Sequence, residues 1–152
     1  MAIRLNEDFK EFLKLLSKNR VRYLLIGGYA VNIHGYPRFT GDLDLWIDND
    51  NENVKRVCDT IRQFGFDDPD LTPETFQRPN VLIRMGVIPY MIEIHTAVSG
   101  VRFEACYPQR VIKEIEGIPV DVIDLKNLLK NKRATGRHRD LDDIENLPEA
   151  VN

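Results

Sequence analysis

The chain has 152 residues, 43% hydrophobic and 30% charged, so it is long enough to bury a core and too apolar for a disordered protein. Its net charge of −3 argues against a protein that coats nucleic acid, and its two cysteines are too few for a disulfide framework. No apolar run approaches the ~20 residues of a membrane span, and no secretory signal is visible, so we expect a cytoplasmic protein.

The first half of the sequence predicts helices and strands in alternation. Apolar residues recur at helical spacing in some segments, and apolar and polar residues alternate strictly in another. These patterns predict helices over 6–18, 28–35 and 52–64, and strands over 21–26 and 42–48. Asn6 can cap the first helix, and Gly65 can end the third.

The second half predicts two hairpins and a helical tail after a proline-rich loop. We expect strands over 81–85, 90–95, 110–115 and 118–123, and helices from residue 125 onward. Because helices and strands are mixed, the class is α/β (α+β), with a mixed β-sheet and helices packed mainly on one face. We expect one domain over 1–152, with a core over about 1–123 and a C-terminal helical tail over about 124–152.

Two aspartates stand in an otherwise apolar strand. Asp42 and Asp44 alternate with Leu43 and Leu45, so the carboxylates share one face and the leucines share the other. Glu93 follows the same alternation in a later strand, and pairing of the two strands would bring three carboxylates together. Carboxylates this close repel one another and raise one another's pKa. A divalent cation removes that penalty, and an all-oxygen ligand set favours Mg²⁺ or Mn²⁺.

A glycine pair precedes the acidic strand. Gly27 and Gly28 lie between an apolar strand and the predicted short helix. Backbone N–H groups at a helix start bind anions, and glycine lets a phosphate approach the backbone closely. An anion cradle followed by a metal site suits a nucleoside triphosphate and its metal ions.

A family resemblance rests on the glycine pair and the acidic strand. Gly27-Gly28, a gap of thirteen residues and the run 40–45, Thr-Gly-Asp-Leu-Asp-Leu, resemble the polymerase-β-type nucleotidyltransferase superfamily. The chain is similar in particular to small bacterial nucleotidyltransferase-like proteins related to abortive-infection and toxin–antitoxin transferases, which the segments 99–103 and 132–143 also fit. Two positions depart from the pattern: Glu93 replaces a commoner aspartate, and Gly28 stands where serine is frequent.

The resemblance implies a nucleotidyltransferase-like fold and two-metal transfer of a nucleotide from an NTP to a hydroxyl acceptor. The acceptor would be a protein, a tRNA or a small molecule, in a toxin–antitoxin or phage-defence setting. Asp42 and Asp44 would hold two Mg²⁺ or Mn²⁺ ions ~3.5–4 Å apart, and Glu93 would hold one of them. The amides of Gly27 and Gly28 would hold the terminal phosphates.

A basic stretch lies near the end of the chain. Six Lys or Arg and no acid fall between residues 126 and 139. By the resemblance, Lys132 and Arg137 are candidates for phosphate contacts, although a solvated helix face explains the stretch equally well. The acids that follow, Asp140 and Asp143, lie three residues apart and can pair with Arg137 and Arg139, which favours a structural role.

Several neighbouring features have competing explanations. His95 is near enough to consider as a general base, but we expect a polar strand residue. Trp46 shares the acidic face and could stack on a base, but we expect it to pack under the C-terminal helices. Residues 48–52 resemble the start of an EF-hand loop, yet Asn53 stands where that loop needs glycine. The two aspartates also match the Asp-x-Asp motif of sugar-nucleotide glycosyltransferases, but that interpretation does not explain the glycine pair.

Two functional hypotheses of different class stay open. The first is a metal-dependent nucleotidyltransferase. The second is a non-catalytic module of a toxin–antitoxin pair that binds a nucleotide or a partner. Because only the C-terminal helices lie outside the predicted core, a partner chain or a second copy in a homodimer would complete the acceptor site. We expect no membrane partner.

Overall fold

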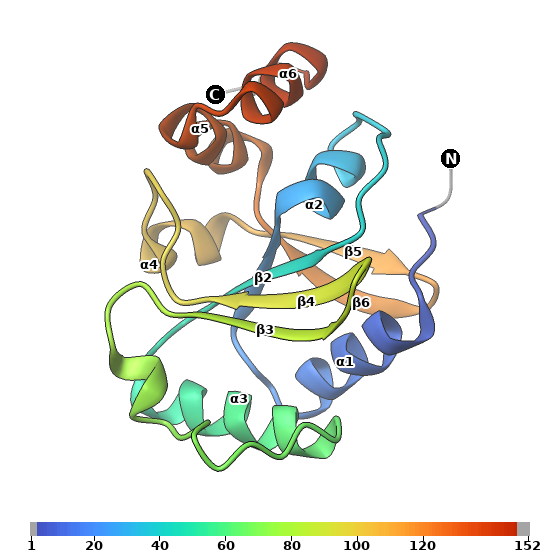
Figure 1. The fold of residues 1–152 in the computed structure, drawn as a ribbon. Helices are drawn as coiled ribbons and strands as arrows, with labels where there is room; N and C mark the ends of the chain where they lie inside the picture. Colours follow the sequence, from blue (N-terminus) through green and yellow to red (C-terminus); the bar gives the residue numbers. More distant parts are fainter. Residues whose placement is uncertain (1–2, 149–152) are drawn as a thin grey trace.

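The computed structural model describes residues 3–148 and has a six-stranded sheet at its centre (Figure 1). The strands are β1 (Tyr23–Ile26), β2 (Leu43–Ile47), β3 (Leu82–Val87), β4 (Tyr90–His95), β5 (Val111–Ile115) and β6 (Ile118–Val122). They lie in the order β3-β4-β2-β1-β6-β5. β2 pairs in parallel with β4, and β1 with β6, whereas the other neighbours are antiparallel. The predicted mixed sheet is therefore confirmed.

Helices lie on both sides of the sheet (Figure 1). The two longest, α1 (Glu7–Lys18) and α3 (Asn51–Gln63), lie together on one side. The C-terminal pair, α5 (Leu125–Thr135) and α6 (His138–Asn146), lies across the other side. Two short helices, α2 (Gly27–Ile33) and α4 (Phe103–Cys106), and two 3-10 turns, Thr75–Gln77 and Tyr107–Gln109, complete the fold. Within residues 3–148, no helix has the length and apolar composition of a membrane span.

The helix boundaries follow from local capping. Asn6 accepts a hydrogen bond from the Phe9 amide at 2.8 Å, as the sequence predicts, and fixes the start of α1. Asp50 caps α3 in the same way through the Asn53 amide, also at 2.8 Å. Gly136 ends α5 in the left-handed region, with a φ of 63°, which an L side chain rarely adopts.

The register of β2 against β4 decides which side chains share a face. Leu43 lies opposite Ile92, and Asp44 lies opposite Glu93. Because side chains alternate along each strand, the apolar pair is buried on one face and the two carboxylates share the other. The predicted juxtaposition of Asp44 with Glu93 is thus confirmed.

Trp46 lies on the same face as Asp44 and is closed off from solvent. The indole is 2% exposed, and its ring packs edge-on against Phe103 of α4 at 5.3 Å between centroids. The sequence analysis did not predict α4, whose four residues are too few to show a helical period. Since Trp46 is covered, it has no free face on which a nucleotide base could stack.

Asn53 joins α3 to the ends of two strands. Its side chain is fully buried and accepts a hydrogen bond from the Arg22 amide at 2.7 Å. Its Nδ2 group donates to the Arg22 carbonyl at 2.9 Å and to the Asp48 carbonyl at 2.6 Å. The side chain therefore bonds three backbone groups, and the Arg22 carbonyl also accepts from the Asp48 amide at 3.2 Å.

The first prediction concerns this connection. Asn53→Ala should lower the free energy of unfolding by ~2–4 kcal/mol, because three backbone groups each lose a hydrogen bond. Asn51→Ala serves as the control, since the exposed Asn51 side chain accepts a hydrogen bond from Gln77 and from no other described residue. Urea denaturation followed by circular dichroism measures both variants. Equal stabilities of the two variants would contradict this role of Asn53.

Candidate functional site

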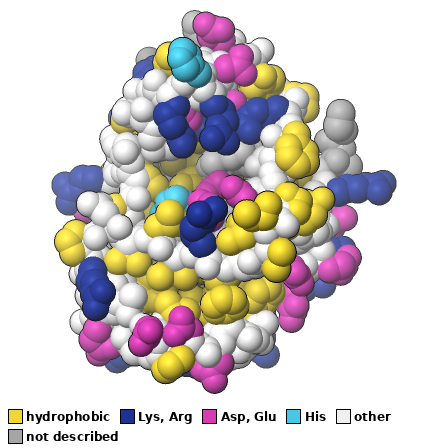
Figure 2. Space-filling view, viewed as in Figure 1, with side chains coloured by type: hydrophobic (Ala, Val, Ile, Leu, Met, Phe, Trp, Pro, Cys, Tyr) yellow, Lys and Arg dark blue, Asp and Glu magenta, His cyan; other side chains and the backbone are white. Residues whose placement is uncertain are grey.

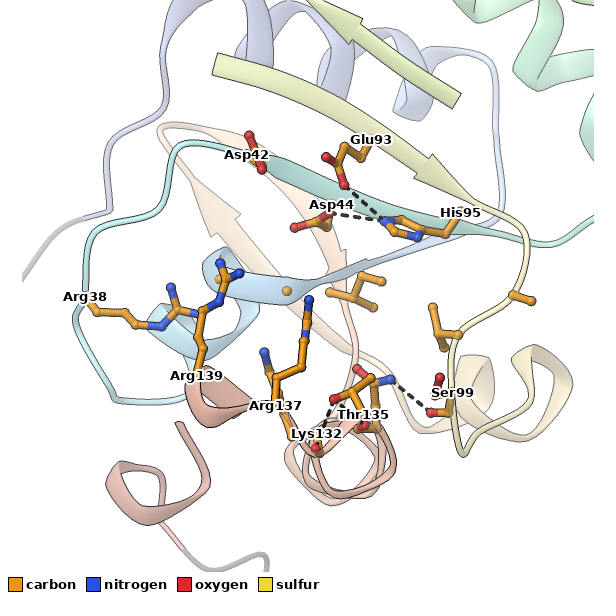
Figure 3. A pocket seen from close by; sticks show the side chains of 16 residues that line it. Arg38, Asp42, Asp44, Glu93, His95, Ser99, Lys132, Thr135, Arg137 and Arg139 are labelled. Carbon is orange, nitrogen blue, oxygen red and sulfur yellow. Dashed lines mark hydrogen bonds and ion pairs between the residues drawn. The ribbon is translucent and has the colours of Figure 1, made fainter. Parts of the chain in front are cut away.

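A cavity of about 360 Å³ lies between the sheet and the C-terminal helices (Figure 2). All seven predicted site residues line it: Gly27, Gly28, Asp42, Asp44, Glu93, Lys132 and Arg137. Acidic side chains gather on the sheet side, and basic side chains from α5, α6 and the loop before β2 face them (Figure 3). The fold thus brings segments more than ninety residues apart in sequence to one cavity, while the role of each residue stays a prediction.

The acidic side is built on β2 and β4. Asp44 and Glu93 are register partners, and Asp42 immediately precedes β2. His95 points back along β4, with Nε2 3.1 Å from Asp44 Oδ1 and 3.8 Å from Glu93 Oε2. Arg84 of β3 places Nε 3.2 Å from the other Glu93 oxygen, Oε1. The sequence analysis considered His95 but did not predict its contact with Asp44.

The carboxylates are crowded enough to affect one another's ionisation. Burial raises the pKa of Glu93, and the neighbouring Asp44 and Asp42 raise it further, whereas Arg84 acts in the opposite direction. Ligand atoms of Asp44, Glu93 and His95 all lie within 4.8 Å of one another, and Asp42 lines the cavity outside this group. A divalent cation would relieve the repulsion, so the donor set fits a metal ion.

The basic side is held by two buried carboxylates of α6. Lys132 places Nζ 3.0 Å from both Asp140 Oδ1 and Asp143 Oδ2. Arg137 places Nε 2.7 Å from Asp140 Oδ2, which confirms the predicted pairing of these two residues. Arg38 binds both oxygens of Asp143, at 2.7 and 3.0 Å. These ion pairs join α5, α6 and the loop before β2 into one wall.

Arg38 is a cavity residue that the sequence analysis missed. It lies in the loop before β2, where its amide donates to Asn32 Oδ1 at 2.8 Å and its guanidinium binds Asp143. A single arginine in a loop carries no periodicity, so only the fold shows that it meets a carboxylate 105 positions away. Arg38 connects the C-terminal helices to the segment that leads into Asp42.

The glycine pair begins α2 beside the acidic group. Gly27 has a φ of +68°, and a Cβ there would lie 2.4 Å from Asp44 Oδ2. A Cβ on Gly28 would lie 2.4 Å from Thr40 Oγ1. Gly27 therefore needs glycine for its backbone conformation, whereas a Cβ on Gly28 would require the Thr40 side chain to move. The N-cap residue, Ile26, has no side-chain oxygen that could accept from the amides at the helix start. A ligand oxygen could therefore accept from the amides there.

No known family profile and no curated protein matches the sequence significantly. Several solved structures share its fold, and two of them cover most of the chain. TM1012 from Thermotoga maritima, provisionally named a nucleotidyltransferase, is 13% identical over 90% of this chain and 88% of that chain, with a TM-score of 0.57. The lincosamide antibiotic adenylyltransferase LnuA, solved with lincomycin bound, is 14% identical over 93% of this chain and 95% of that chain, with a TM-score of 0.56. The chain therefore has a nucleotidyltransferase-like fold, as predicted.

The second prediction concerns the buried carboxylate of Asp140. Burial alone raises the pKa of Asp140, but hydrogen bonds from Arg137, Thr135 and Lys132 outweigh burial and hold the pKa well below its usual range. Ionised Asp140 therefore stabilises the fold above the unfolded-state pKa of about 4, and this contribution is lost as pH falls through the lower folded-state pKa.

Asp140→Asn should accordingly cost ~3 kcal/mol at pH 7, and this cost should shrink as pH falls below about 4. Urea denaturation at a series of pH values measures it. Asp59→Asn is the control, because Asp59 is exposed on α3 and, within residues 3–148, pairs only with Arg62 at 3.4 Å. A cost that stays constant from pH 7 to pH 3 would contradict the account of Asp140.

The third prediction concerns the crowding around Glu93. Because its folded-state pKa is raised, the ionised carboxylate costs stability at neutral pH. In a chelating buffer at pH 7, Glu93→Gln should therefore unfold at a higher temperature than wild type. Added Mn²⁺ should stabilise wild type more than this variant. Glu145→Gln, at an exposed position of α6, should leave both measurements unchanged. A lower melting temperature for Glu93→Gln in the chelating buffer would count against electrostatic crowding.

Proposed function

We propose that this chain is a metal-dependent nucleotidyltransferase that moves a nucleotide from an NTP to a hydroxyl acceptor. The observation that carries the proposal is the division of one cavity into an acidic side and a basic side (Figure 3). A nucleoside triphosphate with divalent ions has the complementary arrangement, since its metals need carboxylates and its phosphates need cations. The fold shared with LnuA, an adenylyltransferase by name, supports the same function.

The acidic side would hold the metal ions. In this proposal Asp42 and Asp44 bind two Mg²⁺ or Mn²⁺ ions, and Glu93 binds one of them. When bound, such ions activate an acceptor hydroxyl and stabilise the departing pyrophosphate. The amides of Gly27 and Gly28, at the start of α2 beside Asp44, hold the terminal phosphates. These residues orient the triphosphate so that its reacting phosphorus faces the acceptor.

The basic side would bind phosphate mainly through Arg137. Its side chain is 63% exposed and borders the cavity, so the guanidinium can reach a ligand while Nε holds Asp140. The Lys132 side chain is 6% exposed, and its ammonium contacts two carboxylates at 3.0 Å. We therefore propose that Lys132 mainly joins α5 to α6 through these carboxylates and that phosphate contact is its secondary role.

The acceptor and the biological setting are further parts of the proposal. Protein, tRNA and small-molecule hydroxyls are all acceptor classes of interest, and the lincomycin bound to LnuA favours testing small molecules first. A second copy or a partner chain would complete the acceptor site. The relation to toxin–antitoxin or phage-defence transferases rests on the sequence resemblance.

The fourth prediction tests the nucleotide site by calorimetry. Wild type should bind at least one NTP in the presence of Mg²⁺ or Mn²⁺ and not in a chelating buffer. The double variant Asp42→Asn/Asp44→Asn should bind at least ~100-fold more weakly, because the ions lose their shared carboxylates. Asp59→Asn, at an exposed position of α3, should bind as wild type does. Equal binding by the double variant, or no binding by wild type, would contradict the proposed site.

Label transfer then separates the enzyme from the alternative function. Incubation of wild type with each α-labelled NTP and a cell extract should label an acceptor, whereas the double variant should label none. Metal-dependent NTP binding without transfer to the protein, RNA or small-molecule fraction would instead favour the non-catalytic nucleotide-binding module.

A further inference from the structure

We propose that His95 is a direct metal ligand beside Asp44 and Glu93, and that its nitrogen makes this site prefer first-row transition ions to Mg²⁺. The inference rests on the proposed function and deepens it by naming the class of metal ion. It also divides the acidic group: Asp44, Glu93 and His95 surround one ion, and Asp42 helps Asp44 to hold the other.

The distances around His95 match those between ligands of one ion. Ligand atoms ~2.1 Å from a metal and at right angles to each other are ~3.0 Å apart, and opposite ligands are ~4.2 Å apart. His95 Nε2 lies 3.1 Å from Asp44 Oδ1 and 3.8 Å from Glu93 Oε2. Small side-chain movements would bring these atoms around a shared ion.

The sheet fixes this arrangement through its register. Asp44 lies opposite Glu93, and His95 lies opposite Trp46, so the imidazole is diagonal to Asp44 on the same face. The ion pair with Arg84 engages Glu93 Oε1, while Oε2 is the oxygen nearer His95. The three donor atoms therefore converge from two strands whose backbones are hydrogen-bonded to each other.

The nitrogen changes which ion the site prefers. Mg²⁺ favours oxygen ligands and retains bound water, whereas imidazole suits transition ions. Replacing one oxygen ligand by His95 Nε2 should therefore shift the preference from Mg²⁺ toward first-row transition ions, of which Mn²⁺ serves as the spectroscopic probe. The competing explanation of this contact is that His95 only donates a hydrogen bond to Asp44 and so orients the Asp44 carboxylate. The two roles differ in whether the nitrogen touches the metal, which spectroscopy can detect.

Pulsed electron paramagnetic resonance of the full chain with Mn²⁺ alone tests the proposal. We expect a ¹⁴N coupling typical of coordinated imidazole, replaced by a ¹⁵N coupling when only the histidines are ¹⁵N-labelled. The chain has three histidines. His95→Gln should abolish the coupling. His34→Gln should retain it, because His34 Nε2 contacts the Ile123 carbonyl at 2.7 Å. The ¹⁵N-labelling experiment uses wild-type protein alone, so it tests the proposal even if His95→Gln fails to fold.

Calorimetry with each metal ion supplies the second measurement. His95→Gln should weaken Mn²⁺ binding by at least ~10-fold and Mg²⁺ binding by less than ~3-fold. Bound Mn²⁺ without a histidine nitrogen coupling would overturn the role of His95 and leave the proposed function intact. Failure of wild type to bind either ion, with or without NTP, would instead overturn the proposed function itself.

Discussion

The parallel pairing of β2 with β4 is the constraint on which the site depends. It sets Asp44 opposite Glu93 and, by the alternation of side chains, puts His95 on the same face. Burial and neighbouring carboxylates raise the pKa of Glu93, so the arrangement costs stability in the absence of a cation. The same crowding makes this donor set suitable for a divalent cation. A shift of one residue in register would send Glu93 into the apolar core and destroy both effects.

In the opposite wall of the cavity, buried carboxylates pair with cationic side chains of the chain itself. Asp140 and Asp143 are buried, and each forms ion pairs with cationic side chains: Asp140 with Lys132 and Arg137, and Asp143 with Lys132 and Arg38. Removing one partner from such a group leaves an uncompensated buried charge, so the network stabilises one arrangement of α5, α6 and the loop before β2. The wall holds a cationic surface at a fixed position facing the carboxylates (Figure 3).

Strand alternation made the acidic residues predictable, because it fixes which side chains share a face whatever the tertiary structure. The partners of the charged residues were harder to predict. Composition revealed a basic stretch, but whether Lys132 is solvated or paired depends on how α5 packs against α6. Arg38 and α4 gave no periodic signal at all. The contact of His95 with Asp44 requires the strand register, which a single sequence does not determine.

The central claim is that the acidic group binds a metal ion together with the phosphates of a nucleotide. Anomalous diffraction from crystals grown with Mn²⁺ and a non-hydrolysable NTP analogue tests it most directly. The account predicts a manganese peak between Asp44 and Glu93, with the triphosphate extending from the start of α2 toward Arg137. A nucleotide bound elsewhere, or bound in this cavity with no manganese at these carboxylates, would contradict it.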